Sequence, residues 1–388
     1  MNKEVTALVY LDNSSTTPID SKVLETMMPF LKEQYANASS NHGFGHQAKD
    51  AIKKSREQIG SLVGSEQHEI IFTSGATEAI NLAIKGVLES YQSKGKHIIT
   101  VKTEHSAVLD VCLFLETKGF EITYLGVDRE GLIDLQELRN ALREDTILVS
   151  VMLANNETGV IQPIKKIADL THKTGALFMT DATQAFGKIP IDVDTVGIDI
   201  MAFSGHKIYG PKGIGGLFVR QRRPNKVKLV PLIHGGGHER GMRSGTSNVP
   251  GIVGLGMAAE IAARDMEKDK EAIEKLRNEL EEELLKIPDT KLNGNKINRL
   301  YNICSVCFSG ADADAIMMGL KSIIVSNGSA CTSTKIEPSH VLIAMGLSEQ
   351  EAYSTIRFSL GRFTNREEIK TTIEKVRSVV EELRAMST

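Results

Sequence analysis

The chain has 388 residues, of which 41% are hydrophobic and 24% are charged, a composition typical of folded globular proteins. Its length exceeds the size at which one hydrophobic core usually stops growing, so we expect two domains. The 46 basic and 49 acidic residues give a net charge of −3 without a long run of one sign, which argues against nucleic-acid binding.

No segment approaches the roughly 20 uncharged residues that a transmembrane helix requires. The first residues, MNKEVTALVYLDNSSTTP, contain no apolar stretch of signal-peptide length. The four cysteines, Cys112, Cys304, Cys307 and Cys331, are too few for a disulfide framework in a chain of this length. We therefore predict a cytoplasmic protein with free thiols and no membrane partner.

Short apolar runs alternate with helical periodicity between about residues 46 and 220, and this alternation predicts an α/β fold. The runs are EIIFT, HIITV, FEITYL, TILVSVML, ALFMTDA, DIMAFS and IGGLFV. Amphipathic segments at 46–63, 106–118 and 164–174 would supply covering helices. Connections of this length favour parallel pairing, so we predict a mostly parallel, seven-stranded sheet.

Beyond Gly256 the pattern changes to a long charged helix over 258–287, a strand-like LYNICSVCFSG and a closing helix over 367–386. These elements predict a smaller α+β domain. A coiled coil is an alternative for the long helix, but its apolar spacing is not sustained over enough heptads. We place the large domain at 16–258, and the small domain at 1–15 and 259–388.

The segment Glu69–Gly86 runs from an apolar strand through Ser-Gly-Ala-Thr directly into a helix. Free backbone N–H groups and the helix dipole would bind an anion there, Gly75 would allow close approach, and Thr77 would add a hydroxyl. A plain helix N-cap would produce the same pattern.

In ALFMTDATQ an apolar strand delivers Asp181 at its carboxyl end, followed by Gln184. Ligands of open α/β sheets bind at such ends. The aspartate could face a protonated pyridine nitrogen and keep that ring an electron sink, or it could cap a helix.

In IMAFSGHKIYGPKGIGG another apolar strand leads to Ser204, His206 and Lys207. Most lysines are solvated surface charges. A lysine leaving a buried strand among glycines differs, because a desolvated ammonium loses its proton more readily and becomes a nucleophile for an aldehyde. We interpret Lys207 as catalytic.

Three hypotheses apply to HGGGHERGMRSGTSN. Zinc ligation by His234 and His238 would need helical spacing, which the intervening glycines disfavour by about 1 kcal/mol each. An oxyanion loop would need a G-x-S-x-G nucleophile elbow, which the sequence lacks. A mobile loop that binds a phosphate or a neighbouring subunit through Arg240, Arg243 and Thr246 is the hypothesis that survives.

VSNGSACTSTKIEPSH sets Cys331 in a polar loop of small residues. Free cysteine is usually buried, so this setting favours an exposed, reactive thiol. The loop leads into IRFSLGR, where Arg357 could bind a substrate carboxylate through two parallel hydrogen bonds.

Cys304 and Cys307 form a lone C-x-x-C. On a strand these positions face opposite sides of the sheet, and no second cysteine pair completes a metal site. We predict that both cysteines serve packing and that the protein has no metal site.

Together these segments resemble the cysteine desulfurase family, in the class V aminotransferase branch of fold-type I pyridoxal-5′-phosphate (PLP) enzymes. The resemblance extends over essentially the whole chain. It is carried by YLDNSSTTP, TSGATEAINLAIKG, KTEHSAVLD, NNETGV, TDATQ, SGHKIYGPKGIGG, GGGHERGMRSGT, GSACTS and IRFSLGRFT.

The resemblance implies that Lys207 carries PLP as a Schiff base, that Asp181 pairs with the pyridine nitrogen and that Gln184 contacts the ring hydroxyl. His105 would stack on the ring and move protons, as an imidazole that titrates near neutrality can. Asn156 would lie beside cofactor and substrate. The implied phosphate and cofactor contacts are Ala76, Thr77, Ser204, His206 and, from a second subunit, Thr246.

By the same resemblance, Asn37 and Arg357 would hold the carboxylate of L-cysteine and Cys331 would accept its sulfur. The products would be L-alanine and a Cys331 persulfide, which a sulfur-acceptor protein would use for iron–sulfur cluster assembly or for tRNA or cofactor thiolation. Because the reference pKa of cysteine, about 8.5, leaves little thiolate at neutral pH, a proton acceptor such as His105 would be needed. The protein would be a homodimer.

Alternatives are an aminotransferase or selenocysteine lyase of the same fold, and a non-catalytic sulfur-relay scaffold. Cys331 argues against the aminotransferase, and the intact Lys207, Asp181 and His105 argue against the scaffold. The sequence departs from the family at Ala36-Asn37-Ala38, where Gly-Asn-Pro is usual, and at Asn327, where serine is common. It also ends at Thr388, whereas the housekeeping branch carries a further tail that docks the iron–sulfur scaffold.

Overall fold

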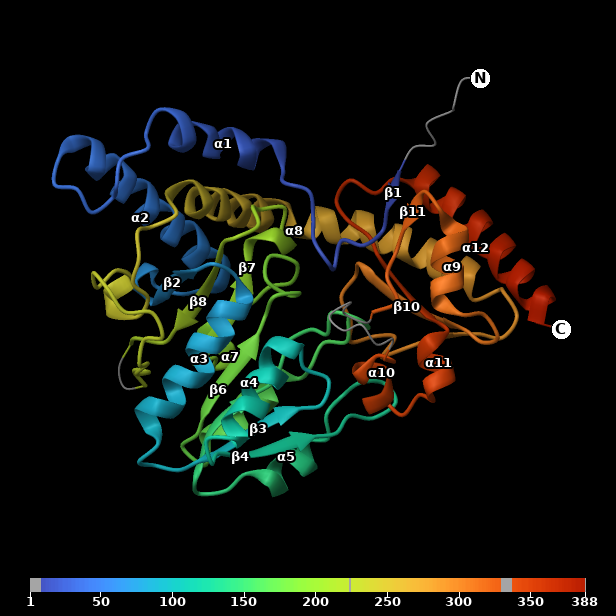
Figure 1. Ribbon diagram of the computed structural model, residues 1–388, viewed down its shortest axis with the longest axis horizontal. Coiled ribbons are helices and arrows are strands. Elements are labelled where there is room, and N and C mark those ends of the chain that lie inside the picture. The colour runs from blue at the N-terminus through green and yellow to red at the C-terminus, as the bar shows by residue number, and fades with distance from the viewer. Residues whose placement is uncertain (1–7, 223–224, 329–336, 388) are drawn as a thin grey trace.

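A computed structural model describes residues 8–222, 225–328 and 337–387. A large α/β unit and a smaller unit lie side by side and share one long helix (Figure 1). Among the described residues, no helix is both long and apolar enough to cross a membrane.

The centre of the large unit is a seven-stranded sheet in the order β2-β8-β7-β6-β5-β3-β4. Only β8 runs antiparallel to its neighbours, β7 and β2, whereas the other pairs are parallel. The predicted mostly parallel sheet is therefore confirmed. The strands are β2 Ile70–Thr73, β3 His97–Val101, β4 Glu121–Leu125, β5 Thr146–Ser150, β6 Leu177–Asp181, β7 Ile200–Ser204 and β8 Gly215–Val219.

Helices cover both faces of this sheet. Successive side chains of a strand point to opposite faces, and both sets are apolar here, so each face must be buried. On β7, Ile200 and Ala202 pack with helices α3 (Ala76–Tyr91) and α4 (Ser106–Glu116). Met201 and Phe203 pack in the cluster on the other face. Helices α2 (Gly43–Val63) and α6 (Ile164–His172) contribute to that second cluster, so all three predicted covering helices are present.

The long helix α8 (Val249–Leu284) begins before the change in composition at Gly256. Its first part, Val249–Ile261, lies in a core of the large unit, and its last part, Ile273–Leu284, lies in the core of the small unit. The helix is therefore a connecting element that packs at both ends, as Figure 1 shows.

The small unit contains a three-stranded antiparallel sheet of β12 (Thr355–Ser359), β10 (Ile303–Phe308) and β9 (Thr290–Leu292). Helices α9 (Ala313–Leu320) and α12 (Arg366–Ser387) pack beside it. The N-terminal strand β1 (Val9–Tyr10) pairs with β11 (Ile323–Ile324), which ties the start of the chain to this unit. We propose, from this packing, domain boundaries at 15/16 and 258/259.

The remaining elements are short, apart from helix α1 with its 12 residues. They are α1 Ser21–Lys32, α5 Leu135–Ala141, α7 Val193–Val196, α10 His340–Ala344, α11 Glu349–Tyr353 and the 3₁₀ turns Gln67–Glu69, Gly205–Lys207 and Glu239–Gly241.

Cys304 and Cys307, both on β10, are buried and unpaired. The prediction that these residues serve packing is confirmed. Within the described ranges, no group of three or more potential ligands could hold a metal ion.

Phe178 on β6 is fully buried in the large core. Phe178→Ala should therefore lower the free energy of unfolding by roughly 3–5 kcal/mol, through lost contacts and a residual cavity. Urea denaturation measures the change. Met318→Ala is the control, because Met318 is 80% exposed and its loss should cost under about 0.5 kcal/mol. Equal effects of the two variants would contradict the assigned core.

Candidate active site

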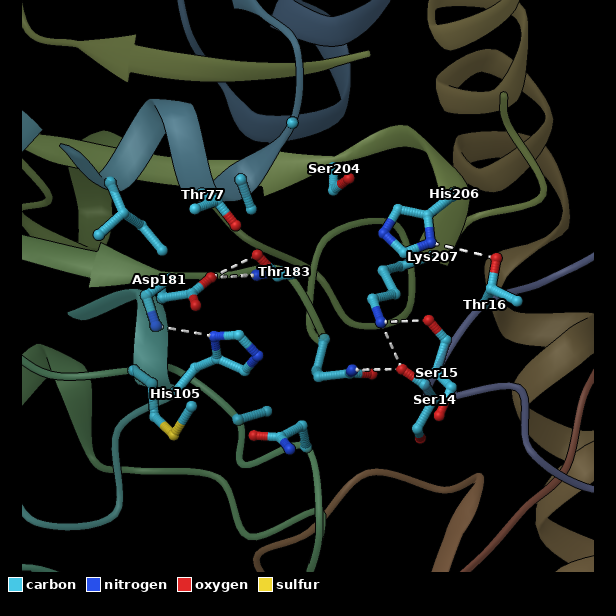
Figure 2. A pocket seen from close by; sticks show the side chains of 18 of the residues that line it. Ser14, Ser15, Thr16, Thr77, His105, Asp181, Thr183, Ser204, His206 and Lys207 are labelled. Atoms are coloured by element: carbon cyan, nitrogen blue, oxygen red, sulfur yellow. Dashed lines mark hydrogen bonds between the residues drawn. The ribbon is translucent and has the colours of Figure 1, made fainter. Parts of the chain in front are cut away.

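A pocket of about 570 Å³ lies at the carboxyl edge of the large sheet (Figure 2). The strands β5, β6 and β7 end there, and β2 runs in the same direction as β7 because both are antiparallel to β8. The volume is within the range of small-molecule sites, about 300–1,000 Å³. Because these strands end at the same edge, the segments that follow them can bring polar side chains to one ligand.

Lys207 lies in the 3₁₀ turn directly after β7. Its Nζ donates hydrogen bonds of 2.6 Å to the carbonyls of Ser14 and of Ser15. The pKa of Lys207 is lowered to about 8, mainly by burial and secondly by the positive charge of the nearby Arg357 guanidinium. The side chain thus has a larger neutral fraction at physiological pH than a surface lysine, and a neutral amine is the form that attacks an aldehyde.

Asp181 is the last residue of β6. Its Oδ1 accepts hydrogen bonds from the backbone N–H (2.9 Å) and the hydroxyl (2.5 Å) of Thr183. Thr183 thereby fixes the carboxylate through one of its two oxygens, at the pocket wall. A fixed carboxylate in this position can stabilise a cationic ring nitrogen.

His105 is the N-cap of α4, and its Nδ1 accepts the backbone N–H of Ala107 at 3.1 Å. The neutral ring therefore carries its proton on Nε2. Burial lowers the pKa of His105, and the neighbouring Lys207 and His340 lower it further. At neutral pH the ring is thus an uncharged donor at Nε2.

The N-terminus of α3 forms an anion cradle. Gly75 precedes the helix, and α3 has no side-chain N-cap hydrogen bond, so first-turn N–H groups stay available and the plain N-cap interpretation is not supported. Thr77, Ser204 and His206 line the same end of the pocket. Burial and Lys207 lower the pKa of His206 to about 4, so its neutral ring acts as a hydrogen-bonding group.

Arg357 on β12 is 4% exposed and forms another wall of the pocket. Its Nη2 donates to Asp12 Oδ1 (2.6 Å) and to Ser15 Oγ (2.8 Å), and its Nη1 donates to the Asn156 carbonyl (2.9 Å). Its Nε is buried without a partner among the described residues. The guanidinium is thus held rigidly and keeps hydrogen-bonding capacity for a carboxylate.

The structure brings most of the predicted site residues together. The lining includes Ala76, Thr77, His105, Asn156, Asp181, Gln184, Ser204, His206, Lys207 and Arg357. Cys331 lies outside the described residues, although Ser326 and Gly328, just before it, line the pocket.

Asn37 and Thr246 are exposed and do not line this pocket. Asn37 Oδ1 accepts the backbone N–H of Ser39 instead. A hydrogen bond of 3.1 Å between Ser39 Oγ and His238 Nε2 joins the Asn37 segment to the loop that carries Thr246. The two predicted residues therefore share one outer surface.

The glycine-rich loop around His238 is anchored to its own chain through acidic partners. Glu239 accepts the backbone N–H of Phe72 and pairs with Arg56, and Arg243 pairs with Glu78 at 2.8 Å. The only helical turn here is the 3₁₀ turn Glu239–Gly241, so among the described residues the helical spacing required for zinc ligation by His234 and His238 is absent.

Several residues that shape the pocket were not predicted from the sequence. Asp12 contributes an oxygen to Arg357 and Ser14 contributes one to Lys207, while Ser15 contributes one to each. Thr183 fixes Asp181. The available signal was the polar run DNSSTT directly after an apolar strand, which resembles the pattern of the other pocket segments.

Comparisons with known proteins agree with this geometry. The aminotransferase class V family model matches residues 9–371. Cysteine desulfurase IscS of Pectobacterium carotovorum is 53% identical over 382 residues, which cover 98% of this chain and 94% of that relative. A NifS-like protein of known structure gives a TM-score of 0.91 at 38% identity, covering 97% of this chain and all (100%) of that one. SspA, solved in complex with cysteine, gives 0.82 at 41% identity over 92% of this chain and 100% of SspA.

The chain belongs to the class V aminotransferases, an α/β family whose cofactor is PLP. Within that family it is a PLP-dependent cysteine desulfurase. The pocket fits the cofactor: the α3 cradle suits a phosphate, Asp181 suits a pyridinium nitrogen and Lys207 suits an aldehyde.

The lowered pKa of Lys207 determines how the rate of PLP capture by the cofactor-free protein should depend on pH. The neutral fraction of the amine rises about tenfold per pH unit below the pKa, which is about 8, and levels off above it. Stopped-flow absorbance should show the capture rate follow this curve. A rate that keeps rising toward the ordinary lysine pKa of 10.5 would contradict the assigned environment.

Proposed function

We propose that this pocket takes the sulfur of L-cysteine onto Cys331 and releases L-alanine. The observation that carries the proposal is the half-buried amine of Lys207, held at one pocket wall with Asp181, His105 and Arg357 around the same space. The pocket also reaches Ser326 and Gly328, immediately before the segment that contains Cys331.

PLP, when bound, supplies the electron sink that lets the substrate α-carbon lose its proton and the carbon–sulfur bond weaken. Lys207 holds the cofactor and exchanges protons at Nζ. Asp181 would keep positive charge on the cofactor ring, and His105 would donate a hydrogen bond from Nε2 to a group in the pocket. The apolar side chains of Met152 and Ala154 in the lining exclude water from this chemistry.

Arg357 binds the substrate carboxylate in this proposal. Its hydrogen bonds to Asp12, Ser15 and the Asn156 carbonyl fix the guanidinium before the substrate arrives, so little side-chain entropy is lost on binding. A charge-assisted contact at this wall orients the α-carbon toward Lys207.

The sulfur transfer balances without an external oxidant. The Cys331 thiolate forms a bond to the substrate sulfur, the carbon–sulfur bond breaks, and its electron pair stays with the carbon fragment, which is protonated to alanine. The persulfide then passes to a sulfur-acceptor protein, an iron–sulfur scaffold or a thiolation enzyme. A cytoplasmic location belongs to the same proposal, supported by the bacterial relatives.

The proposed enzyme is a homodimer. Thr246 is exposed and absent from the pocket of its own chain, which supports a role at the phosphate site of a second subunit. Asn37 lies on the same surface, through the Ser39–His238 contact, so a subunit placed there would meet both segments.

Cys331→Ser should separate binding from sulfur transfer. The variant should keep PLP and the spectral change caused by L-cysteine, because Lys207, Asp181 and His105 are unaltered. Alanine release should fall by at least about 100-fold, since a hydroxyl is hardly ionised at neutral pH and cannot replace the thiolate. Chromatography of alanine without added keto acid measures the reaction, which also excludes an aminotransferase. Cys304→Ser is the control and should retain transfer; if it alone lost transfer, the choice of Cys331 would be wrong.

Sedimentation at micromolar protein concentration should give a dimer with and without PLP. Thr246→Ala should leave the dimer intact and weaken PLP binding, by about ten- to 150-fold for a lost hydrogen bond to a charged group. Ser247→Ala, at a neighbouring hydroxyl, serves as the comparison. A monomer with full PLP affinity would refute the proposed role of Thr246 across the interface.

A further inference from the structure

A second lysine, Lys188, lies behind the pocket and is only 7% exposed. It follows Gln184 by one helical turn, in which the N–H groups of Phe186 and Lys188 donate to the carbonyls of Ala182 and Ala185. Gly187 in this turn has a φ of +70°, and a Cβ there would lie 2.9 Å from Ile208. The tight turn therefore aims Lys188 at the back of Gln184.

Lys188 Nζ donates to the Gln184 backbone carbonyl at 2.9 Å and to its side-chain Oε1 at 3.3 Å. At the other end of the amide, Gln184 Nε2 donates to the Ser14 carbonyl at 2.9 Å. A carbonyl cannot donate, so the Ser14 carbonyl requires the N–H end of the amide, and Lys188 Nζ donates to the opposite, carbonyl end. The two contacts therefore allow only one orientation of the Gln184 amide, with a second N–H of Nε2 left for a ligand.

No acidic side chain pairs with Lys188 in the part of the chain that the structure describes. The ionisable groups around it are Lys207 and His206 on the neighbouring turn, Tyr209, Tyr301, and Asp269, which is paired with Arg362 at 2.8 Å. Burial and the nearby Lys207 lower the pKa of Lys188 to about 7. An amine donates hydrogen bonds in either protonation state, so the contact to Gln184 does not require the charge.

We propose that Lys188 is a positioning residue that fixes the Gln184 amide so that its N–H edge faces the ring oxygen of PLP. The inference rests on the proposed contact between Gln184 and the ring hydroxyl. A donor to that oxygen stabilises its anionic form and makes the neighbouring Lys207–cofactor linkage less basic. Without Lys188 the amide keeps only its contact with the Ser14 carbonyl, so it is held less tightly and its second N–H is directed less firmly at the ring oxygen.

The test is a pH titration of the absorption band of purified, PLP-loaded protein. Lys188→Met should raise the midpoint of the spectral transition by about 0.5 to 1 pH unit, the effect of one weakened hydrogen bond. Lys188→Arg retains a donor and should stay within about 0.2 pH unit of the unaltered protein. Lys166→Met, at an exposed lysine of α6, controls for loss of a lysine in general.

A double-variant cycle separates positioning from a direct charge effect. If Lys188 acts through Gln184, then adding Lys188→Met to Gln184→Leu should move the midpoint no further. A full additional shift, an unchanged midpoint in Lys188→Met, or a full shift in Lys188→Arg would each overturn the proposal. Absence of bound PLP in the unaltered protein would instead refute the cofactor assignment.

Discussion

The active site depends on two backbone carbonyls, those of Ser14 and Ser15, which accept hydrogen bonds from the half-buried amine of Lys207. Their segment leaves β1 in the small unit, reaches across the pocket and continues into the large unit, where Thr17 bonds to the His206 carbonyl. The same segment holds Arg357 through Asp12 and Ser15. One short stretch of polar residues therefore contacts both Lys207 and Arg357, which come from different units.

Burial drives most ionisable groups around this segment toward their neutral forms. The pKa values of Lys207, His105 and His206 are lowered, and burial raises the pKa of Glu157 to about 7 and that of Glu104 well above its usual range. Burial thereby brings the pKa values of Lys207 and Glu157 close to neutrality, where a group can both take up and release a proton. The surroundings thus suit a reaction in which protons leave and return several times.

Apolar periodicity predicted the sheet, its mostly parallel pairing and its covering helices, because these follow from which residues must be buried. Lys207, Asp181 and the α3 cradle could also be placed, since each directly follows an apolar strand. Asp12, Ser14 and Lys188 could not, because their roles depend on contacts between segments 170 or more residues apart or on a local turn around Gly187. The single helix shared by both units was predicted to begin too late, since its buried first part has the composition of the preceding domain.

The claim that sulfur passes from substrate to Cys331 is tested most directly by mass spectrometry. The PLP-loaded protein would be treated with L-cysteine in the absence of reductant, blocked with an alkylating agent and digested. The account predicts that the peptide containing Cys331 gains the mass of one sulfur atom in proportion to the alanine formed, while the peptides of Cys112, Cys304 and Cys307 do not. Alanine formation with the extra sulfur on another cysteine, or on none, would contradict it.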